Sequence, residues 1–144
     1  MHHEHYVTLL EGFCRLTGMD LTESLLADGQ FCLDEVDFTL DYGGVTAPAS
    51  VLIYCDFGPV GELNVSSCME LLGRNLLLYD GEHTAAFAVS PESGRILLMT
   101  SADLFHTTAA ALLEQLEYCA QLSTQWRDGT WTTIEDEYKE AGNG

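Results

Sequence analysis

The chain has 144 residues, of which 23 are acidic and five are basic, so its formal net charge is −18. This length is that of a single domain, and a chain with 47% hydrophobic residues can bury a core without a metal ion or a disulfide. Nucleic acid and anionic lipid both require clustered cationic side chains, which five scattered basic residues do not provide, so we expect neither as a partner. The basic residues are Arg15, Arg74, Arg95, Arg127 and Lys139.

The cysteines indicate a reducing compartment. Their number is odd, they include no CxxC pair, and each lies in an apolar run, as is typical of small buried hydrophobic residues. The N-terminus lacks the basic and apolar regions of a signal peptide, and no run of about 18 apolar residues could cross a membrane. We therefore expect a cytoplasmic protein. The cysteines are Cys14, Cys32, Cys55, Cys68 and Cys119.

The first half of the chain predicts one helix followed by three strands. Residues 2–17 form an amphipathic helix, since their apolar side chains recur at three- and four-residue intervals. Gly18 is a plausible end for this helix, whereas Gly12 weakens it. From residue 30 onwards the period becomes two, which predicts strands at 31–33 and 36–42 and a more central strand at 51–57. The apolar residues of the helix are Tyr6, Leu9, Leu10, Phe13 and Leu16.

The second half predicts a helix, two strands and a long helix. Ser67 and Glu70 form an S-x-x-E capping box, so a helix should begin there and reach residue 76 or 78. Strands are expected at 84–89 and 95–100, joined by a turn at 91–94, and a helix at 104–127. The order α-β-β-β-α-β-β-α predicts an α+β domain, 1–127, with helices packed on a mostly antiparallel twisted sheet. Residues 128–144 are expected to be an acidic, flexible tail in which Trp131 is unexplained.

The sequence HHEH at residues 2–5 suggests a metal site. His2 and His5 could share a helix face, and His3 could chelate Cu(II) or Ni(II) together with a free amino terminus. A polar, frayed helix start explains the same residues without a metal, because chain ends are mobile. We expect no metal here.

Four carboxylates between residues 34 and 41 raise the question of calcium binding or acid–base catalysis. Their spacing is not that of an EF-hand loop. Alternation along the predicted strand places Asp37 and Asp41 on its solvent face, where charges protect a sheet edge from aggregation. We therefore interpret the group, which is Asp34, Glu35, Asp37 and Asp41, as solvated.

Signatures of catalysis are absent from the sequence. A cysteine nucleophile needs a nearby base, and outside the N-terminus only His83 and His106 could serve. Neither belongs to a recognisable Cys/His signature. GxSxG, GxGxxG and the Walker A loop are also missing. We expect no enzymatic activity and no cofactor.

The helix that begins near Ser67 has more apolar residues than one core should need. Leaving four Leu or Met side chains in water would forgo about 6–12 kcal/mol of burial, which is comparable with the stability of a whole domain. Self-pairing about a two-fold axis is the simplest way to cover them. We therefore expect a homodimer through this second helix, with Met69, Leu72 and Leu76 at the interface. For the first helix, burial in the core and exposure for a partner remain equally open.

Several weak signals, in the right order, carry a resemblance to a known family. They are LLEGFCRL in the first helix, FCLDEVDFTLDY and SVLIYCDFG in the strands, LLGRNLLL with leucines flanking Asn75, the hairpin SPESGRILLM, and QWR at the end of the last helix. From about residue 5 to Arg127 the chain resembles the class I type III secretion chaperones of the Tir chaperone (CesT-like) family. The length and the acidity of the chain also match those of this family.

The resemblance implies a small acidic homodimer of the bacterial cytoplasm that binds the unfolded N-terminal segment of a secreted effector and keeps it soluble and partly unfolded for export. The second helix would form the dimer seam. The effector would wind around the first helix and the sheet, and could add a strand to an open edge. The residues that this implies for effector binding are Leu9, Phe13, Phe31, Leu33 and Phe38.

Two other hypotheses remain open at this stage. One is an adaptor or regulatory module that binds a folded protein on a similar fold, and the other is a small enzyme with a carboxylate or cysteine site. The tail from residue 128 and the stretch GGVTAPAS depart from the family pattern, and both could alter the choice of partner. The identity and number of effector clients cannot be read from the residues.

Overall fold

A computed structural model describes residues 2–42, 49–59, 65–78 and 85–130 of the chain. It confirms the α+β class and the antiparallel sheet. The elements in chain order are α1 (His2–Thr17), α2 (Glu23–Asp28), β1 (Gln30–Leu33), β2 (Val36–Tyr42), β3 (Ser50–Pro59), α3 (Val65–Leu78), β4 (Ala86–Val89), β5 (Arg95–Asp103) and α4 (Ala109–Asp128).

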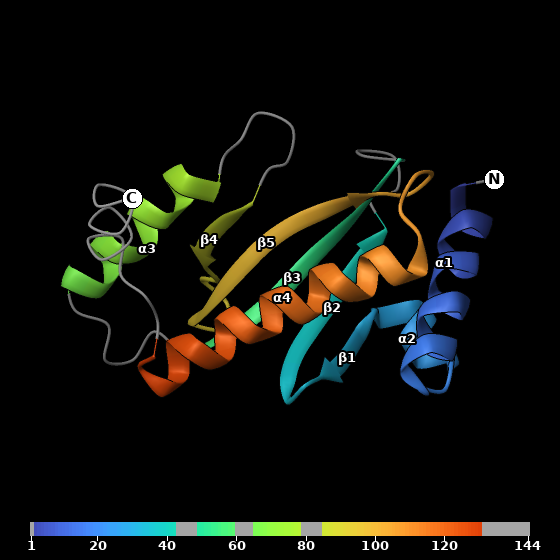
Figure 1. Cartoon of the computed structure of the whole chain (residues 1–144), viewed down its shortest axis with the longest axis horizontal. Helices are drawn as coiled ribbons and strands as arrows, with labels where there is room; N and C mark the ends of the chain where they lie inside the picture. Colours follow the sequence, from blue (N-terminus) through green and yellow to red (C-terminus); the bar gives the residue numbers. More distant parts are fainter. Residues whose placement is uncertain (1, 43–48, 60–64, 79–84, 131–144) are drawn as a thin grey trace, which may run out of the picture.

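The five strands form one sheet in the order β1-β2-β3-β5-β4, and every neighbouring pair is antiparallel. Helix α4 crosses one face of this sheet, and α1 packs against α4 at one end (Figure 1). The strands turn their buried side chains toward these helices, as the alternating burial of β2 and β3 requires. The largest fully buried side chains are Phe13, Phe38, Phe57, Leu10, Ile53, Ile96, Leu112 and Leu116.

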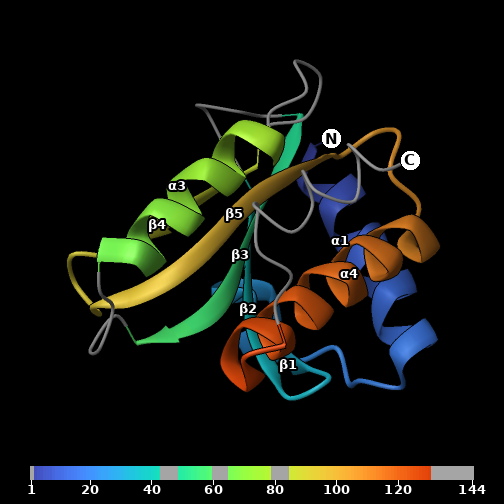
Figure 2. The same cartoon turned by 60° about the vertical axis from the view of Figure 1, so that its left-hand side comes forward.

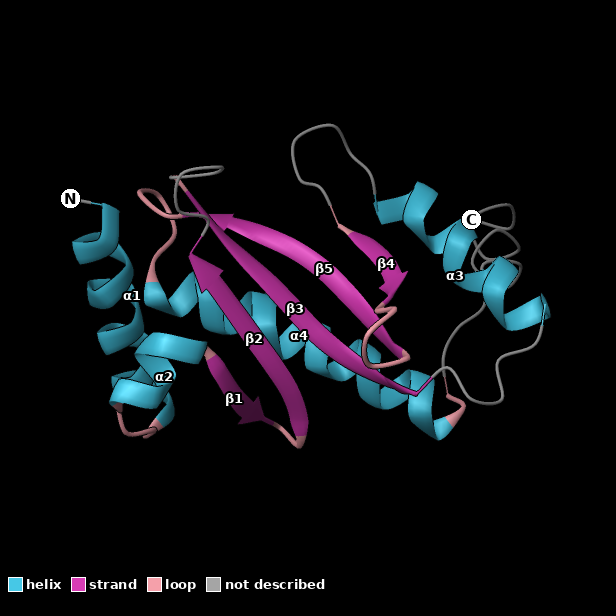
Figure 3. Ribbon diagram, turned by 180° about the vertical axis from the view of Figure 1, so that it is seen from behind, coloured by secondary structure: helices cyan, strands magenta, loops and turns pink. Residues whose placement is uncertain are grey.

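Helix α3 lies apart from α1 and α4. It runs beside β4, at the far edge of the sheet from β1, and contacts that strand (Figure 2). Seen from behind, the second face of the sheet has no described helix over it (Figure 3). The architecture is thus a sheet with one covered face, one open face, and a helix along one edge.

Helix α2 was missing from the predicted order. It has six residues, too few for an apolar period to emerge, although its end signals are present. The Thr22 hydroxyl accepts a hydrogen bond from the Leu25 N–H at 3.0 Å, and Gly29 closes the helix in the left-handed conformation with φ 67°. A Cβ atom on Gly29 would lie 1.9 Å from the Leu40 carbonyl oxygen, so this position requires glycine.

Two predicted helix starts were wrong. Helix α3 begins at Val65, so Ser67 lies inside it and not at its cap. Helix α4 begins at Ala109 and not near residue 104, because the Thr108 hydroxyl accepts from the Ala111 N–H at 3.1 Å and caps the helix there. The buried Leu104 belongs to the preceding loop.

Gly12 has a packing role that its helix propensity conceals. A Cβ atom at this position would lie 3.0 Å from the Cβ of Ala109, at the first residue of α4. The absent side chain therefore lets α1 and α4 approach closely. The free energy lost by placing glycine in a helix is offset by this contact between helices.

The β1–β2 hairpin has an unusual turn. Leu33 pairs with Val36, so only Asp34 and Glu35 lie between the strands, and their φ angles are 52° and 66°. Two-residue turns of this kind favour Asn-Gly or Asp-Gly, because a left-handed non-glycine residue costs roughly 1–2 kcal/mol. Asp tolerates the conformation better than Glu does, so most of the strain lies at Glu35. Farther along β2, Asp37 and Asp41 are exposed, which confirms the predicted solvent face.

Replacing Glu35 by glycine should therefore stabilise the protein. We expect Glu35→Gly to raise the free energy of unfolding by about 0.5–1 kcal/mol, measured by urea denaturation, since it relieves the left-handed strain. Glu35→Ala removes the same carboxylate and keeps the strain, so it should give no gain. Equal stabilities for the two variants would contradict this account of the turn.

Candidate functional site

Helix α3 presents two apolar faces. Leu71 is only 6% exposed and joins the main core, whereas four side chains on another face are largely in solvent. Intervals of four, three and four residues place these four on one side of the helix. We call them the α3 stripe: Val65 (79% exposed), Met69 (64%), Leu72 (63%) and Leu76 (74%). All three residues predicted for a dimer interface therefore lie exposed on one continuous surface.

Strand β4 extends this apolar surface. Its last residue, Val89, is exposed, and it lines the same shallow cavity of about 210 Å³ as Leu72. Leu71 and Phe87 form the inner wall of that cavity. The α3 stripe thus continues onto the sheet.

A single asparagine fastens α3 to β4. The Asn75 side-chain oxygen accepts a hydrogen bond from the Phe87 N–H at 2.6 Å, and its amide nitrogen donates to the Phe87 carbonyl at 3.3 Å. Both groups belong to the backbone of an edge strand, so the amide takes the place that a neighbouring strand would occupy. Asn75 therefore orients α3 and closes the middle of the β4 edge to strand addition. Strand β1 forms the other edge of the sheet.

The five residues expected to bind an effector fall into two groups. Leu9, Phe13 and Phe38 are 7%, 0% and 2% exposed and belong to the core, so the structure places them inside the fold and not on its surface. Phe31 and Leu33 are half-buried on β1 and can be reached from solvent. The sequence pattern could not separate the groups, because all five lie at inward positions of their elements.

The two groups meet in an aromatic stack at the β1 edge. The ring of Phe31 lies 5.6 Å from that of Phe38 and stacks on it at an interplanar angle of 13°. On another side, Phe31 is 5.3 Å from Phe13 of α1. Phe31 therefore covers two fully buried rings at an edge strand of the sheet.

The open face of the sheet carries a groove of about 690 Å³ between β1 and the start of β5. Its lining is mixed, with Phe31, Tyr54 and Leu97 beside the carboxylates of Asp37 and Asp56. This face is visible in Figure 3, on the side away from α4. Arg95 lines the same groove and is ion-paired with Asp56, so a ligand there would meet apolar surface next to the exposed carboxylate of Asp37.

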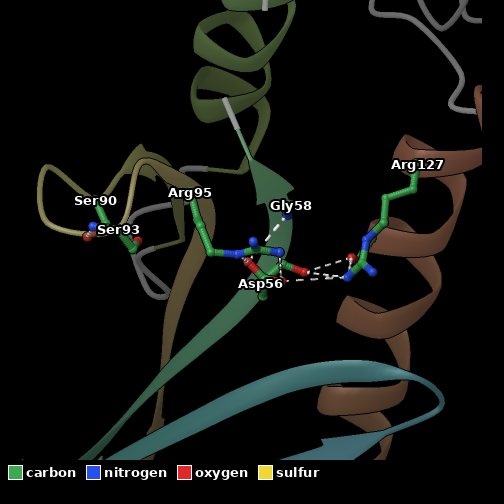
Figure 4. Close-up of polar contacts among 7 residues, drawn as sticks. Asp56, Gly58, Ser90, Ser93, Arg95 and Arg127 are labelled. Carbon is green, nitrogen blue, oxygen red and sulfur yellow. Dashed lines mark hydrogen bonds and ion pairs between the residues drawn. The ribbon is translucent and has the colours of Figure 1, made fainter. Parts of the chain in front are cut away.

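An ion-pair network ties the end of α4 to the sheet. Asp56 receives two hydrogen bonds of 2.8 Å from the guanidinium of Arg95, and its backbone carbonyl accepts from the buried Ser123 hydroxyl at 2.8 Å and from Arg127 at 3.0 Å (Figure 4). The register of β3 against β5 shifts between Asp56 and Gly58, and this irregularity lies at the network. The bonds join β3, β5 and α4 at one point.

The position of Asp56 in the sequence already indicates that this carboxylate is paired. Asp56 follows five residues of a buried strand, and a carboxylate in such a place must be paired. The Arg95 guanidinium holds the pKa of Asp56 below its usual range, with a smaller contribution from the backbone N–H of Gly58. Only the fold could identify Arg95 and Arg127 as the partners, because they are 39 and 71 residues away.

The described residues offer little for catalysis or metal binding. Burial raises the pKa of the Cys119 thiol to about 11 and raises that of Cys55 as well, so both stay protonated at neutral pH and are poor nucleophiles. No group of three His, Cys, Asp or Glu in the described ranges could hold a metal ion. His5 of the HHEH sequence packs edge-on against Phe105 at 4.7 Å. His83 lies outside the described residues, as do Trp131 and the rest of the tail from residue 131.

A comparison with protein families shows to which family the chain belongs. A model of the Tir chaperone protein (CesT) family matches residues 45–127, which is more than half of the chain. The chain belongs to the Tir chaperone (CesT) family. The matched stretch contains β3, α3, β4, β5 and nearly all of α4, so it includes the α3 stripe, Asn75 and the Asp56 network. The expected family is thereby confirmed.

Solved structures agree with this CesT-family fold. A chain in the structure of the HopA1–SchA chaperone–effector complex is 17% identical, with a TM-score of 0.67 over 88% of this chain and 95% of that one. A chain in the complex of the Yersinia pestis type III secretion chaperone SycH with a YscM2 fragment is 18% identical, with a TM-score of 0.61 and coverage of 84% and 98%. At these identities the likeness establishes the fold.

A third structure, the ExoT–SpcS complex from Pseudomonas aeruginosa, contains a chain that is 14% identical, with a TM-score of 0.56 over 84% of this chain and 96% of that one. A comparison with curated protein sequences gives no match. No helix in the described part of the CesT-family chain is long and apolar enough to cross a membrane.

Asp56→Asn should destabilise the fold by about 1–3 kcal/mol at pH 7, since the amide keeps one uncharged acceptor for the two guanidinium donors of Arg95 in a partly buried place. The folded pKa of Asp56 is lowered, so its contribution is present above the unfolded pKa and is lost as pH falls through the folded pKa. The difference between wild type and variant should therefore shrink below about pH 4.

Urea denaturation at neutral and acidic pH measures this difference. Asp20→Asn, at an exposed carboxylate, is the matched control and should change stability by less than about 0.5 kcal/mol. A deficit in Asp56→Asn that stayed constant from pH 7 to about pH 3 would mean that the carboxylate charge is not what stabilises this site.

Proposed function

We propose that the protein is a non-catalytic chaperone for a type III secreted effector. It binds the N-terminal segment of the effector and keeps it soluble and partly unfolded for export from the bacterial cytoplasm. It acts as a homodimer and needs no cofactor. Residues 1–127 would form the chaperone domain and 128–144 an accessory acidic tail.

The observation that carries this proposal is the coexistence of two apolar surfaces at opposite edges of one sheet. The α3 stripe lies at the β4 edge, and the half-buried Phe31 and Leu33 lie at the β1 edge. Monomeric proteins rarely expose apolar surfaces of this kind, which usually mark sites of interaction. Family membership supports the assignment, as do similar folds in complexes described as chaperone–effector and type III secretion chaperone structures.

The α3 stripe suits a second copy of the chain. It is straight, lies on one helix, and is held in a defined orientation by Asn75, so the same surface on two protomers can pair about a two-fold axis. Val89 would widen the contact onto the sheet. This leaves the β1 edge of each protomer for the effector.

The β1 edge suits an extended peptide. Backbone groups there can pair with an added strand, and Phe31 and Leu33 supply apolar side chains on one face of it. The β4 edge is less suitable, since Asn75 already binds Phe87 on that side. When no client is bound, repulsion between chains with a net charge of −18 would keep their apolar surfaces from aggregating.

Leu72→Glu should separate the dimer. A two-fold contact contains the changed residue twice, so the loss of two buried leucines should weaken dimerisation at least 100-fold. Size-exclusion chromatography with light scattering at micromolar concentration measures the change. Leu16→Glu changes another exposed leucine, on α1, and should leave the dimer intact. A monomeric wild type, or a Leu72→Glu variant that remains dimeric, would exclude this interface.

Co-expression with an effector encoded beside the chaperone tests the client. We expect an N-terminal effector segment to co-purify, and hydrogen exchange should show that this segment lacks its own stable fold. Phe31→Ala should change capture at least tenfold, since this ring lies where the client binds. Capture falls if the client packs against Phe31, and it rises if the client takes the place of Phe31. Tyr118→Ala removes an exposed aromatic on α4 and should have no effect. Capture of a fully folded partner alone would support an adaptor instead.

A further inference from the structure

Strand β1 occupies a slot at the edge of the core. The floor of the slot is made by the fully buried rings of Phe13 and Phe38, and Phe31 fills it at ring distances of 5.3 Å and 5.6 Å. Leu33, two residues later, turns to the same side beside the buried Val36. We call this space the β1 slot.

The attachment of β1 is weak for a strand that covers core side chains. It has only four residues, which pair on one side with β2, and none of the four is fully buried. The turn that joins it to β2 is strained, since Asp34 and Glu35 both adopt left-handed φ angles. At its other end the chain turns at Gly29, another left-handed residue. Short, edge-located and strained segments are the ones that open at low free energy.

We propose that β1 is an exchangeable strand and that a segment of the client replaces it in the β1 slot. This inference rests on the proposed function and deepens it, since it names the site and the kind of peptide. Exchange gives the client access to Phe13 and Phe38, which a strand added outside β1 could not reach. It also releases the strain of the Asp34–Glu35 turn, so the cost of opening is partly offset.

The slot defines the client chemistry. A replacing strand must place an aromatic side chain where Phe31 lies and an aliphatic one two residues later, where Leu33 lies, because side chains alternate along a strand. The residue between them takes the place of Cys32, opposite the exposed Asp37 on the open face. A lysine or arginine suits that position. The expected motif is therefore aromatic, basic or polar, aliphatic.

The structure allows β1 to be locked by one substitution. Cys32 lies directly opposite Asp37, one pair away from the two-residue turn. Pairs at that position are of the non-hydrogen-bonded kind, whose Cα atoms are about 4.5 Å apart and within disulfide range. Asp37→Cys, made in a Cys68→Ser background and oxidised, should join β1 to β2. Asp37→Ser in the same background controls for loss of the carboxylate.

The probe is a fluorescent peptide that copies residues 29–34 with serine in place of Cys32, GQFSLD. Fluorescence anisotropy should show binding to the reduced Asp37→Cys protein and to Asp37→Ser, and at least tenfold weaker binding to the oxidised form. Adding reductant should restore it. A peptide with alanine in place of Phe31 should bind at least tenfold more weakly to the reduced protein.

Equal binding by oxidised and reduced protein would overturn the proposal, since it would mean that peptides add outside β1 or on the open sheet face. Failure of the peptide to bind any form would overturn it too. Hydrogen exchange of the whole chain gives a second readout: β1 amides should exchange at least tenfold faster than those of β3, and Glu35→Gly should slow them. Exchange at equal rates in β1 and β3 would exclude opening.

Neither measurement uses an effector. If β1 proves locked while an unfolded effector segment still co-purifies, only the exchange mechanism fails. If β1 exchanges but no effector is captured, the proposed function fails and the slot belongs to another peptide.

Discussion

The two hydrogen bonds between Asn75 and the backbone of Phe87 constrain much of the molecule. An edge strand presents unpaired N–H and carbonyl groups, and these must be satisfied by water, another strand or a side chain. Here a side-chain amide does so from a helix, and α3 is thereby held along the sheet with Leu71 turned inward. Leu72 and Leu76, on another face of the same helix, therefore point outward.

That arrangement makes the two edges of the sheet unequal. The β4 edge is occupied by an amide and flanked by a rigid apolar helix, which suits a partner of fixed shape. The β1 edge ends in a short strand with a strained turn, and there the core is covered by one half-buried ring, Phe31. A surface of this second kind suits an extended chain that brings its own side chains. The same five strands therefore provide two different modes of recognition.

The Asp56 network explains how the covered face keeps its geometry between these edges. Ser123 and Arg127 lie one turn apart near the end of α4, and both bind the Asp56 carbonyl. Arg95 binds the carboxylate from β5. A helix whose last turn is held at the sheet, and whose first turn contacts Gly12 of α1, is fixed at both ends. Both edges are thus built on a rigid centre.

The sequence by itself determined the class of the fold, most elements and the excess of apolar residues on α3, because each of these is a local period of two or nearly four. It also predicted the exposed Asp37 and Asp41. It missed α2, which is too short for a period, and misplaced the starts of α3 and α4, because capping depends on which hydroxyl reaches which N–H.

Tertiary structure alone separated Phe13 and Phe38 from Phe31, and Leu71 from Leu72. Inward-facing residues look alike in sequence, and only the packing of distant elements decides which of them remain in contact with water. The pairing of Asp56 with Arg95 and Arg127, and of Asn75 with Phe87, was likewise decided by the fold, since these partners are brought together from far along the chain or from different elements.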